Sequence, residues 1–155
     1  MQKYIGTKLL NAKPMKLKAA TELLRRDIGY KGTLDENDDA DGYLAEYPDG
    51  YQSWSPFYAF EPAYRPITNM SFGLAIEALK IGKIVCRAGW NGKGMYVFLI
   101  QGSNNIASLH GYGFGELLGE PTFRDAMFMK TVDNQLVPWT VSQTDALADD
   151  WMIVE

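Results

Sequence analysis

Apolar residues in the second half of the chain follow a helical period in one segment and fall into short runs in several others. One face of residues 70–80 is apolar at a spacing of three and four positions, which predicts an amphipathic helix that ends at Gly82. The residues on this face are Phe72, Ala75, Ile76 and Leu79. Apolar runs predict strands, and a capped helical turn precedes the last of them. These strands cover residues 84–87, 95–101, 126–130, 136–139 and 151–155. The order predicts an α+β domain with a small, mainly antiparallel sheet and one main helix.

The first part of the chain has its own pattern of helix and strand signals. A short strand is expected to end at Pro14, and residues 17–28 have helical spacing with Gly29 as a stop. Two alternating runs, 43–47 and 51–54, flank Pro-Asp-Gly and predict a β-hairpin. Ser55 and Pro56 then predict the start of a short helix that Pro62 ends or bends. We therefore expect a smaller α+β unit over residues 1–66 and a second domain over 67–155.

Composition and charge narrow the classes of function. The chain of 155 residues is 46% hydrophobic and 22% charged, which is typical of a folded protein, and its net charge of −4 argues against a surface for DNA or RNA polymers. The N-terminal residues lack the apolar core of a signal peptide, and no apolar run is long enough to span a membrane. With a single cysteine there is no intrachain disulfide, so the sequence predicts a reduced, cytoplasmic protein without a membrane partner.

The inventory of reactive side chains is poor for catalysis. Cys86 and His110 are the only residues of their types, which excludes multi-histidine zinc chemistry within one chain. Cys86 lies in an apolar strand, where burial is the usual fate of a lone cysteine. The acidic loop 35–41 lacks the glycine and distant glutamate of a calcium-binding EF-hand. No catalytic residue, metal or cofactor is therefore expected.

Three segments carry groups that could bind a ligand, and each also has a purely structural interpretation. In residues 87–94, glycines, two cations and Trp90 could hold phosphates and a base, or Trp90 could simply pack in the core. Ser142 and Asp145 fit a capping box, although a helix start can also accept an anion or a ribose hydroxyl. The glycine-rich segment 110–119 lacks the strand, helix and acidic residue of a dinucleotide fingerprint, so a surface loop is favoured, which could still lie over a pocket.

Two long motifs of the second domain resemble the Thoeris anti-defence two family of phage proteins. They are MSFGLAIEALKIGKIVCRAGWNGKGMYVFL and MKTVDNQLVPWTVSQTDALADDWMIVE, and the segment HGYGFGELLGEPTF between them departs from the family pattern. Residues 4–65 resemble a separate small phage family of uncharacterised function. That resemblance rests on YIGTK, AKPM, GYLAEY with SWSP, and FEPAYR.

The resemblance implies a protein that sequesters a cyclic ADP-ribose isomer, or a cyclic oligonucleotide, without cleaving it. It also implies a homotetramer with pockets between protomers, acting in the cytoplasm of the infected host. Motif matching and chemistry together give eight candidate ligand-binding residues: Phe72, Arg87, Trp90, Asn91, Trp139, Ser142, Thr144 and Asp145. The rings would stack on adenine, Arg87 would contact a diphosphate, and Asn91, Thr144 and Asp145 would bind ribose hydroxyls. The alternatives are a phage accessory or structural protein that acts through protein contacts, and a nucleotide-cleaving enzyme.

Overall fold

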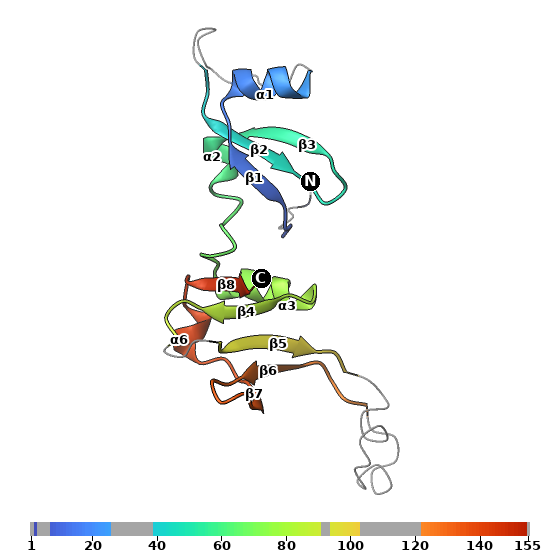
Figure 1. Ribbon diagram of the computed structural model, residues 1–155, viewed down its shortest axis with the longest axis vertical. Coiled ribbons are helices and arrows are strands. Elements are labelled where there is room, and N and C mark those ends of the chain that lie inside the picture. Colours follow the sequence, from blue (N-terminus) through green and yellow to red (C-terminus); the bar gives the residue numbers. More distant parts are fainter. Residues whose placement is uncertain (1, 3–6, 26–38, 91–93, 103–121, 155) are drawn as a thin grey trace, which may run out of the picture. The chain divides into compact units, whose positions relative to one another are not determined.

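The chain folds into two compact units that divide between Arg65 and Pro66. The computed structural model describes residues 2, 7–25, 39–90, 94–102 and 122–154, and Figure 1 labels their helices and strands. Each unit combines an antiparallel sheet with short helices, so the predicted α+β class is confirmed. No helix in these ranges is long and apolar enough to cross a membrane.

The first unit contains a three-stranded antiparallel sheet in the order β1-β2-β3. Its strands are β1 (Asn11–Pro14), β2 (Gly42–Glu46) and β3 (Gln52–Pro56). The tight turn between β2 and β3 confirms the predicted hairpin. It is closed by a hydrogen bond from the Tyr47 amide to the Tyr51 carbonyl at 2.9 Å, and Gly50 adopts a φ of 81°, which suits glycine.

The two helices of this unit begin or end differently from the sequence prediction. Helix α1 (Leu17–Leu24) ends because Arg25 takes a left-handed φ of 49° and bonds to the Glu22 carbonyl. The predicted stop at Gly29 lies outside the described residues, whereas α1 already ends at Leu24. Ser55 is not the N-cap of α2 (Phe57–Phe60), since it pairs with Tyr43 in the β2–β3 ladder. Pro56 ends β3 and takes the N-cap position instead.

Trp54 anchors the core of the first unit. Its ring is 6% exposed, and its indole nitrogen donates a hydrogen bond to the Met15 carbonyl at 2.7 Å. Gly42 makes room for it, because a Cβ at position 42 would lie 2.4 Å from the Trp54 ring and from the Ser55 carbonyl. Glycine is thus required here by the close approach of the tryptophan rather than by its backbone angles.

The second unit contains a five-stranded antiparallel sheet in the order β7-β6-β5-β4-β8. Its strands are β4 (Ile84–Arg87), β5 (Tyr96–Ile100), β6 (Ala126–Lys130), β7 (Leu136–Pro138) and β8 (Trp151–Val154). All five predicted strands are present, and β6 and β7 form the predicted hairpin, with Asn134 at a φ of 63° in its turn.

Helix α3 (Phe72–Lys80) packs against β4, β5 and β8 (Figure 1). Its apolar face meets strand residues that include Val85, Val97 and Trp151, which are all 0% exposed. The amide of Gly82 bonds to the Leu79 carbonyl at 3.0 Å with a φ of 81°, so the predicted helix end is confirmed. A second, short helix, α6 (Gln143–Ala146), connects β7 to β8 at the opposite edges of the sheet.

The outer edge of β8 is covered by the segment that leads into α3. Met70 and Trp151 exchange backbone hydrogen bonds at 2.8 and 3.1 Å, and the Ile153 amide donates to the Ile67 carbonyl at 2.9 Å. This pairing protects an edge that would otherwise offer unpaired donors and acceptors.

Candidate functional site

Three aromatic rings from distant parts of the second unit gather around a fourth, that of Trp151. Phe72 at the start of α3, Trp90 after β4 and Trp139 after β7 have ring centroids 5.3, 5.4 and 6.0 Å from that of Trp151. Trp90 and Trp139 also meet edge to face at 6.3 Å. The structure therefore brings together the three aromatic residues that the sequence selected.

The rings differ in how much surface they present. Trp151 is 0% exposed and belongs to the core, whereas Phe72, Trp90 and Trp139 are half-buried and pack against that core from outside. The two interpretations of Trp90, core packing and ligand contact, are thus physically compatible. A half-buried ring gains stability from its buried part and can still offer surface for stacking.

Arg87, at the end of β4, lies between two aspartates. Its Nε donates to Asp150 Oδ1 and its Nη1 donates to Asp145 Oδ1, both at 2.7 Å. The Arg87 and Asp145 side chains are only 15% and 16% exposed, while that of Asp150 is 33% exposed. The guanidinium is therefore largely neutralised within the unit before any ligand arrives.

Asp145, on α6, connects the ion pair to the aromatic rings. Its Oδ1 also accepts a hydrogen bond from Trp90 Nε1 at 3.2 Å, and its backbone carbonyl accepts one from Trp151 Nε1 at 2.9 Å. Its amide donates to Ser142 Oγ at 3.1 Å, and the Ser142 hydroxyl donates to Asp145 Oδ2 at 2.6 Å. Ser142 is therefore the N-cap of α6, as the sequence predicts, and Asp145 fixes the positions of two indoles.

The contacts keep all three groups in their charged forms. Hydrogen bonds to Asp150 and Asp145 raise the pKa of Arg87. Burial acts to raise the pKa of Asp145, but hydrogen bonds from Ser142, Arg87 and Trp90 together outweigh it and lower that pKa. The pKa of Asp150 is lowered chiefly by its hydrogen bond from Arg87.

The remaining candidate residues are less closely connected to this cluster. Thr144 is exposed on α6, and no contact within the described ranges joins its side chain to the rings or the ion pair. Asn91 and the glycine-rich segment 110–119 lie outside the described residues, as does His110. Cys86 is half-buried, and burial followed by the charge of Asp150 raises the pKa of its thiol.

Among the residues whose positions are described, no three His, Cys, Asp or Glu side chains are grouped in a way that could hold a metal ion. The arrangement of Arg87, Asp145 and Asp150 is a network of ion pairs in which each carboxylate accepts from donors of the protein. This network can fix the positions of neighbouring side chains, and its carboxylate oxygens can accept hydrogen bonds from N–H or hydroxyl groups of a ligand.

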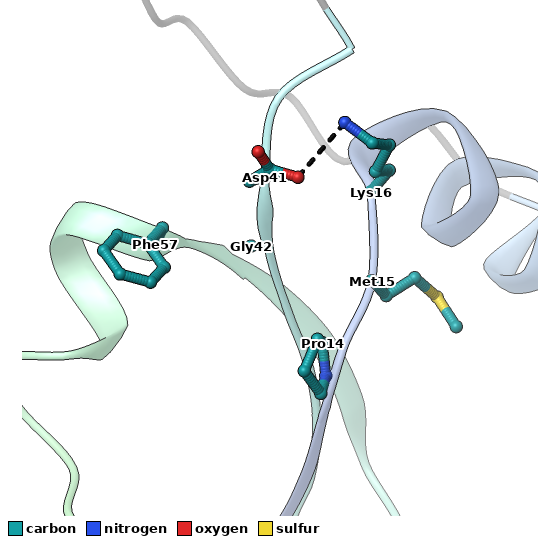
Figure 2. A pocket seen from close by; sticks show the side chains of 6 residues that line it. All are labelled: Pro14, Met15, Lys16, Asp41, Gly42 and Phe57. Atoms are coloured by element: carbon teal, nitrogen blue, oxygen red, sulfur yellow. Dashed lines mark ion pairs between the residues drawn. The ribbon is translucent and has the colours of Figure 1, made fainter.

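The first unit has a hollow of its own, shown in Figure 2. It has a volume of about 530 Å³ and lies at the start of β2, with Phe57 on one side and the Lys16–Asp41 ion pair, at 3.1 Å, on the other. Phe57 is 54% exposed. None of the eight candidate residues lies in this unit.

Sequence reasoning missed Trp151 and Asp150, which hold the cluster together. Trp151 occupies an inward position of an alternating strand, so its place in the core was readable, but its central role among four rings depends on the fold. Asp150 precedes that strand in an acidic pair, and acidic pairs on a surface are common. Only the pairing of Arg87 with Trp151 brings Asp150 beside β4.

Two comparisons with known proteins point to one family. The family model of the Thoeris anti-defense 2-like domain matches residues 70–154. The protein Thoeris anti-defense 2 of Bacillus phage SP01 is 54% identical over 87 residues, which are 56% of this chain and 97% of that protein. The range matched by the family model contains all eight candidate residues and both aspartates that bind Arg87. On this similarity, the chain belongs to the Thoeris anti-defense 2-like family.

Proposed function

We propose that this protein is a phage anti-defence protein that binds and sequesters a cyclic ADP-ribose-type immune signal of the Thoeris system. The observation that carries the proposal is the cluster of half-buried rings, Phe72, Trp90 and Trp139, on a fixed core within a domain of this family. An adenine base needs a flat apolar partner, and such stacking contributes about 1–3 kcal/mol per base. Cyclic oligonucleotides present the same kind of base and are the second class of ligand.

The role of Arg87 in this proposal differs from that of a free cation. Two of its donor nitrogens bind Asp145 and Asp150, so its main contribution is to fix the position of α6 relative to the end of β4. The fixed network supports binding because a preorganised site loses less entropy when the ligand arrives. Asn91, Ser142, Thr144 and Asp145 complete the proposed set, with the polar groups directed to ribose hydroxyls.

The proposal includes assembly into a homotetramer with pockets shared between protomers. The sheet face opposite α3 supports it, because strands β5 and β6 present Tyr96, Phe98 and Phe128 there as half-buried rings. A second copy packed on such a face would bury aromatic surface, which is typical of interfaces. The proposed site of action is the cytoplasm of the infected host cell.

We further propose that the protein does not cleave its ligand, which is released chemically intact. Hydrolysis of a diphosphate or glycosidic bond needs an activated water, which comes from a metal or a well-placed general base. In the described cluster, the hydrogen bonds from Arg87 keep both carboxylates ionised and occupied. Sequestration requires only affinity and exclusion of water, which this kind of site can supply.

The decisive experiment recovers the ligand after binding. Protein is mixed with a cyclic ADP-ribose isomer, free ligand is removed, the protein is denatured, and the released nucleotide is identified by mass spectrometry. We expect intact cyclic nucleotide in proportion to the number of sites, with no change on adding magnesium, manganese or zinc. Linear ADP-ribose or AMP that accumulates with time beyond the number of sites would establish an enzyme instead.

A further inference from the structure

Asp150 contacts three successive residues at the end of β4. Its Oδ1 accepts from Arg87 Nε at 2.7 Å and its Oδ2 accepts from the Gly89 amide at 2.8 Å. Its backbone carbonyl accepts from the Ala88 amide at 3.1 Å. One residue thus fixes the strand end, the main chain of the turn that follows, and the guanidinium beside it.

The turn is shaped for this contact. A Cβ at position 89 would lie 3.0 Å from Asp150 Oδ2, which is tighter than nine in ten real Cβ contacts. Glycine at this position therefore lets the backbone amide approach the carboxylate. The backbone of Gly89 needs no left-handed conformation, so contact with Asp150 is the structural reason for a glycine here.

The residue that follows this turn is Trp90. Its amide closes the turn on the Arg87 carbonyl at 3.3 Å, and its indole reaches Asp145 at 3.2 Å. The main chain before Trp90 is thus held by Asp150 and its ring by Asp145. Together these two carboxylates determine where the ring stands relative to Trp139.

The charges of the cluster favour a structural role for its ion pairs over direct phosphate binding. Two carboxylates face one guanidinium, so the three side chains carry a net charge of −1. A phosphate placed against this cluster would meet an excess of negative charge. Apart from Asp145, which the proposed function also places at ribose hydroxyls, the cluster resembles a supporting layer behind the residues that touch a ligand.

We propose that Asp150 is a positioning residue for ligand binding, which acts by holding the turn that carries Trp90. This inference rests on the proposed function. A site whose aromatic contact is fixed in advance binds more tightly than one in which the turn must be ordered by the ligand.

The test combines two variants that break the same contact from opposite sides, each with a matched control. Asp150→Asn removes the charge and places an amide group against the donors, and Asp149→Asn changes its exposed neighbour in the same way. Gly89→Ala adds the methyl group that meets Asp150, whereas Gly73→Ala adds one whose nearest atom, Ser71 Oγ, is 3.8 Å away. The dissociation constant for a cyclic ADP-ribose isomer is measured by calorimetry, and amide hydrogen exchange of residues 88–90 is measured without ligand.

We expect Asp150→Asn and Gly89→Ala each to raise the dissociation constant about tenfold and to speed exchange of the backbone amide at position 89. The controls should stay within about twofold of the wild type, and the double variant should be no weaker than the weaker single variant because both act on one contact. If one variant fails to fold, the other still tests the contact.

Three outcomes would overturn the inference. Wild-type affinity in Asp150→Asn would show that the contact does not support binding. Weakened binding with unchanged exchange at Gly89 would make Asp150 a direct ligand contact rather than a positioning residue. A wild-type protein that binds none of the cyclic ADP-ribose isomers would remove the proposed function and this inference together, a result distinct from the first two.

Discussion

The guanidinium of Arg87 and the carboxylate of Asp145 meet at 2.7 Å, although the two residues are 58 positions apart in the sequence. The pair joins the end of β4, an inner strand of the sheet, to α6, which lies in the segment that crosses from β7 to β8. Both side chains are at least 84% buried. Water screens such a pair weakly, and removing one partner leaves a charge with poor solvation.

Asp145→Ala should therefore lower the free energy of unfolding by about 2–4 kcal/mol, since it also removes the acceptor for Trp90 and Ser142. The exposed pair Lys80–Glu77 is the matched control, because its side chains are 59% and 43% exposed. Glu77→Ala should cost less than about 0.5 kcal/mol. Urea unfolding of both variants measures the difference, and equal losses would show that burial of the Arg87–Asp145 pair has no energetic consequence.

Replacing the tryptophans one at a time should separate binding from folding. Trp90→Ala and Trp139→Ala should weaken nucleotide binding by about 1–3 kcal/mol while the protein stays folded, because each ring is half-buried. Trp151→Ala should instead lower stability by about 3–5 kcal/mol, because that ring is 0% exposed.

Melting temperature and affinity measured on the same samples distinguish these cases. If Trp90→Ala were to lose as much stability as Trp151→Ala, Trp90 would be a core residue and would leave the proposed site.

The network around Arg87 should make the stability of the second unit sensitive to acid. Asp145 and Asp150 have folded pKa values below the ordinary value of 3.8, so their contribution to stability is complete above that pH. This contribution to stability is lost as the pH falls through the lowered pKa values of the folded state, because the two carboxylates bind protons more readily in the unfolded state. The raised pKa of Arg87 lies far above this range and adds no slope.

We expect Asp145→Asn to flatten the decline of stability below about pH 4, and Asp149→Asn, at an exposed position, to preserve it. Chemical unfolding at a series of pH values provides the measurement. If Asp145→Asn lost stability at low pH as steeply as the wild type, other titratable groups would control the acid sensitivity.

Gly42→Ala should destabilise the first unit by about 2 kcal/mol or more, since the added methyl group would collide with the Trp54 ring and the Ser55 carbonyl. Gly73→Ala in α3 is the control, where the helix gains propensity without a clash. Thermal unfolding followed by near-ultraviolet circular dichroism reports the packing of Trp54. A Gly42→Ala protein as stable as the wild type would require the strand to shift at this point.

Assembly is tested by light scattering at micromolar concentration. We expect a particle four times the mass of the 17.4 kDa chain, and Phe98→Lys on the sheet face opposite α3 should reduce that mass. A clean monomer in the wild-type protein would contradict both the tetramer and the shared pocket. Lys83→Ala, at an exposed position on another part of the unit, should leave the mass unchanged.

The strands and main helices could be read from the sequence because their signals are local. The helical spacing before Gly82 and the Pro-Asp-Gly turn each specify a structure within a few residues. Errors occurred where a nonlocal contact decided the outcome. Ser55 has the chemistry of an N-cap, yet its pairing with Tyr43 keeps it in a strand.

The residue types of the candidate site could be predicted from the sequence, but the contacts between these residues could not. The family motif and the positive charge of the side chain together selected Arg87 as a phosphate partner. Its actual neighbours, Asp145 and Asp150, depend on the antiparallel pairing of β4 with β8, which a single sequence does not encode in any local pattern. Trp151 was missed as an organiser for the same reason.

The pairing of Met70 with Trp151 has a consequence for how the second unit is made in the cell. Strand β8 lies between β4 and the segment that leads into α3, and it is the last of the five strands to be synthesised. During synthesis on the ribosome, neither β4 nor the segment around Met70 can pair with β8 until residues 151–154 emerge. The packing around Trp151 and the Arg87 network therefore cannot form earlier. The unit should thus complete its core in one late step, and a chain released before Trp151 would expose its apolar helix face to host chaperones and proteases.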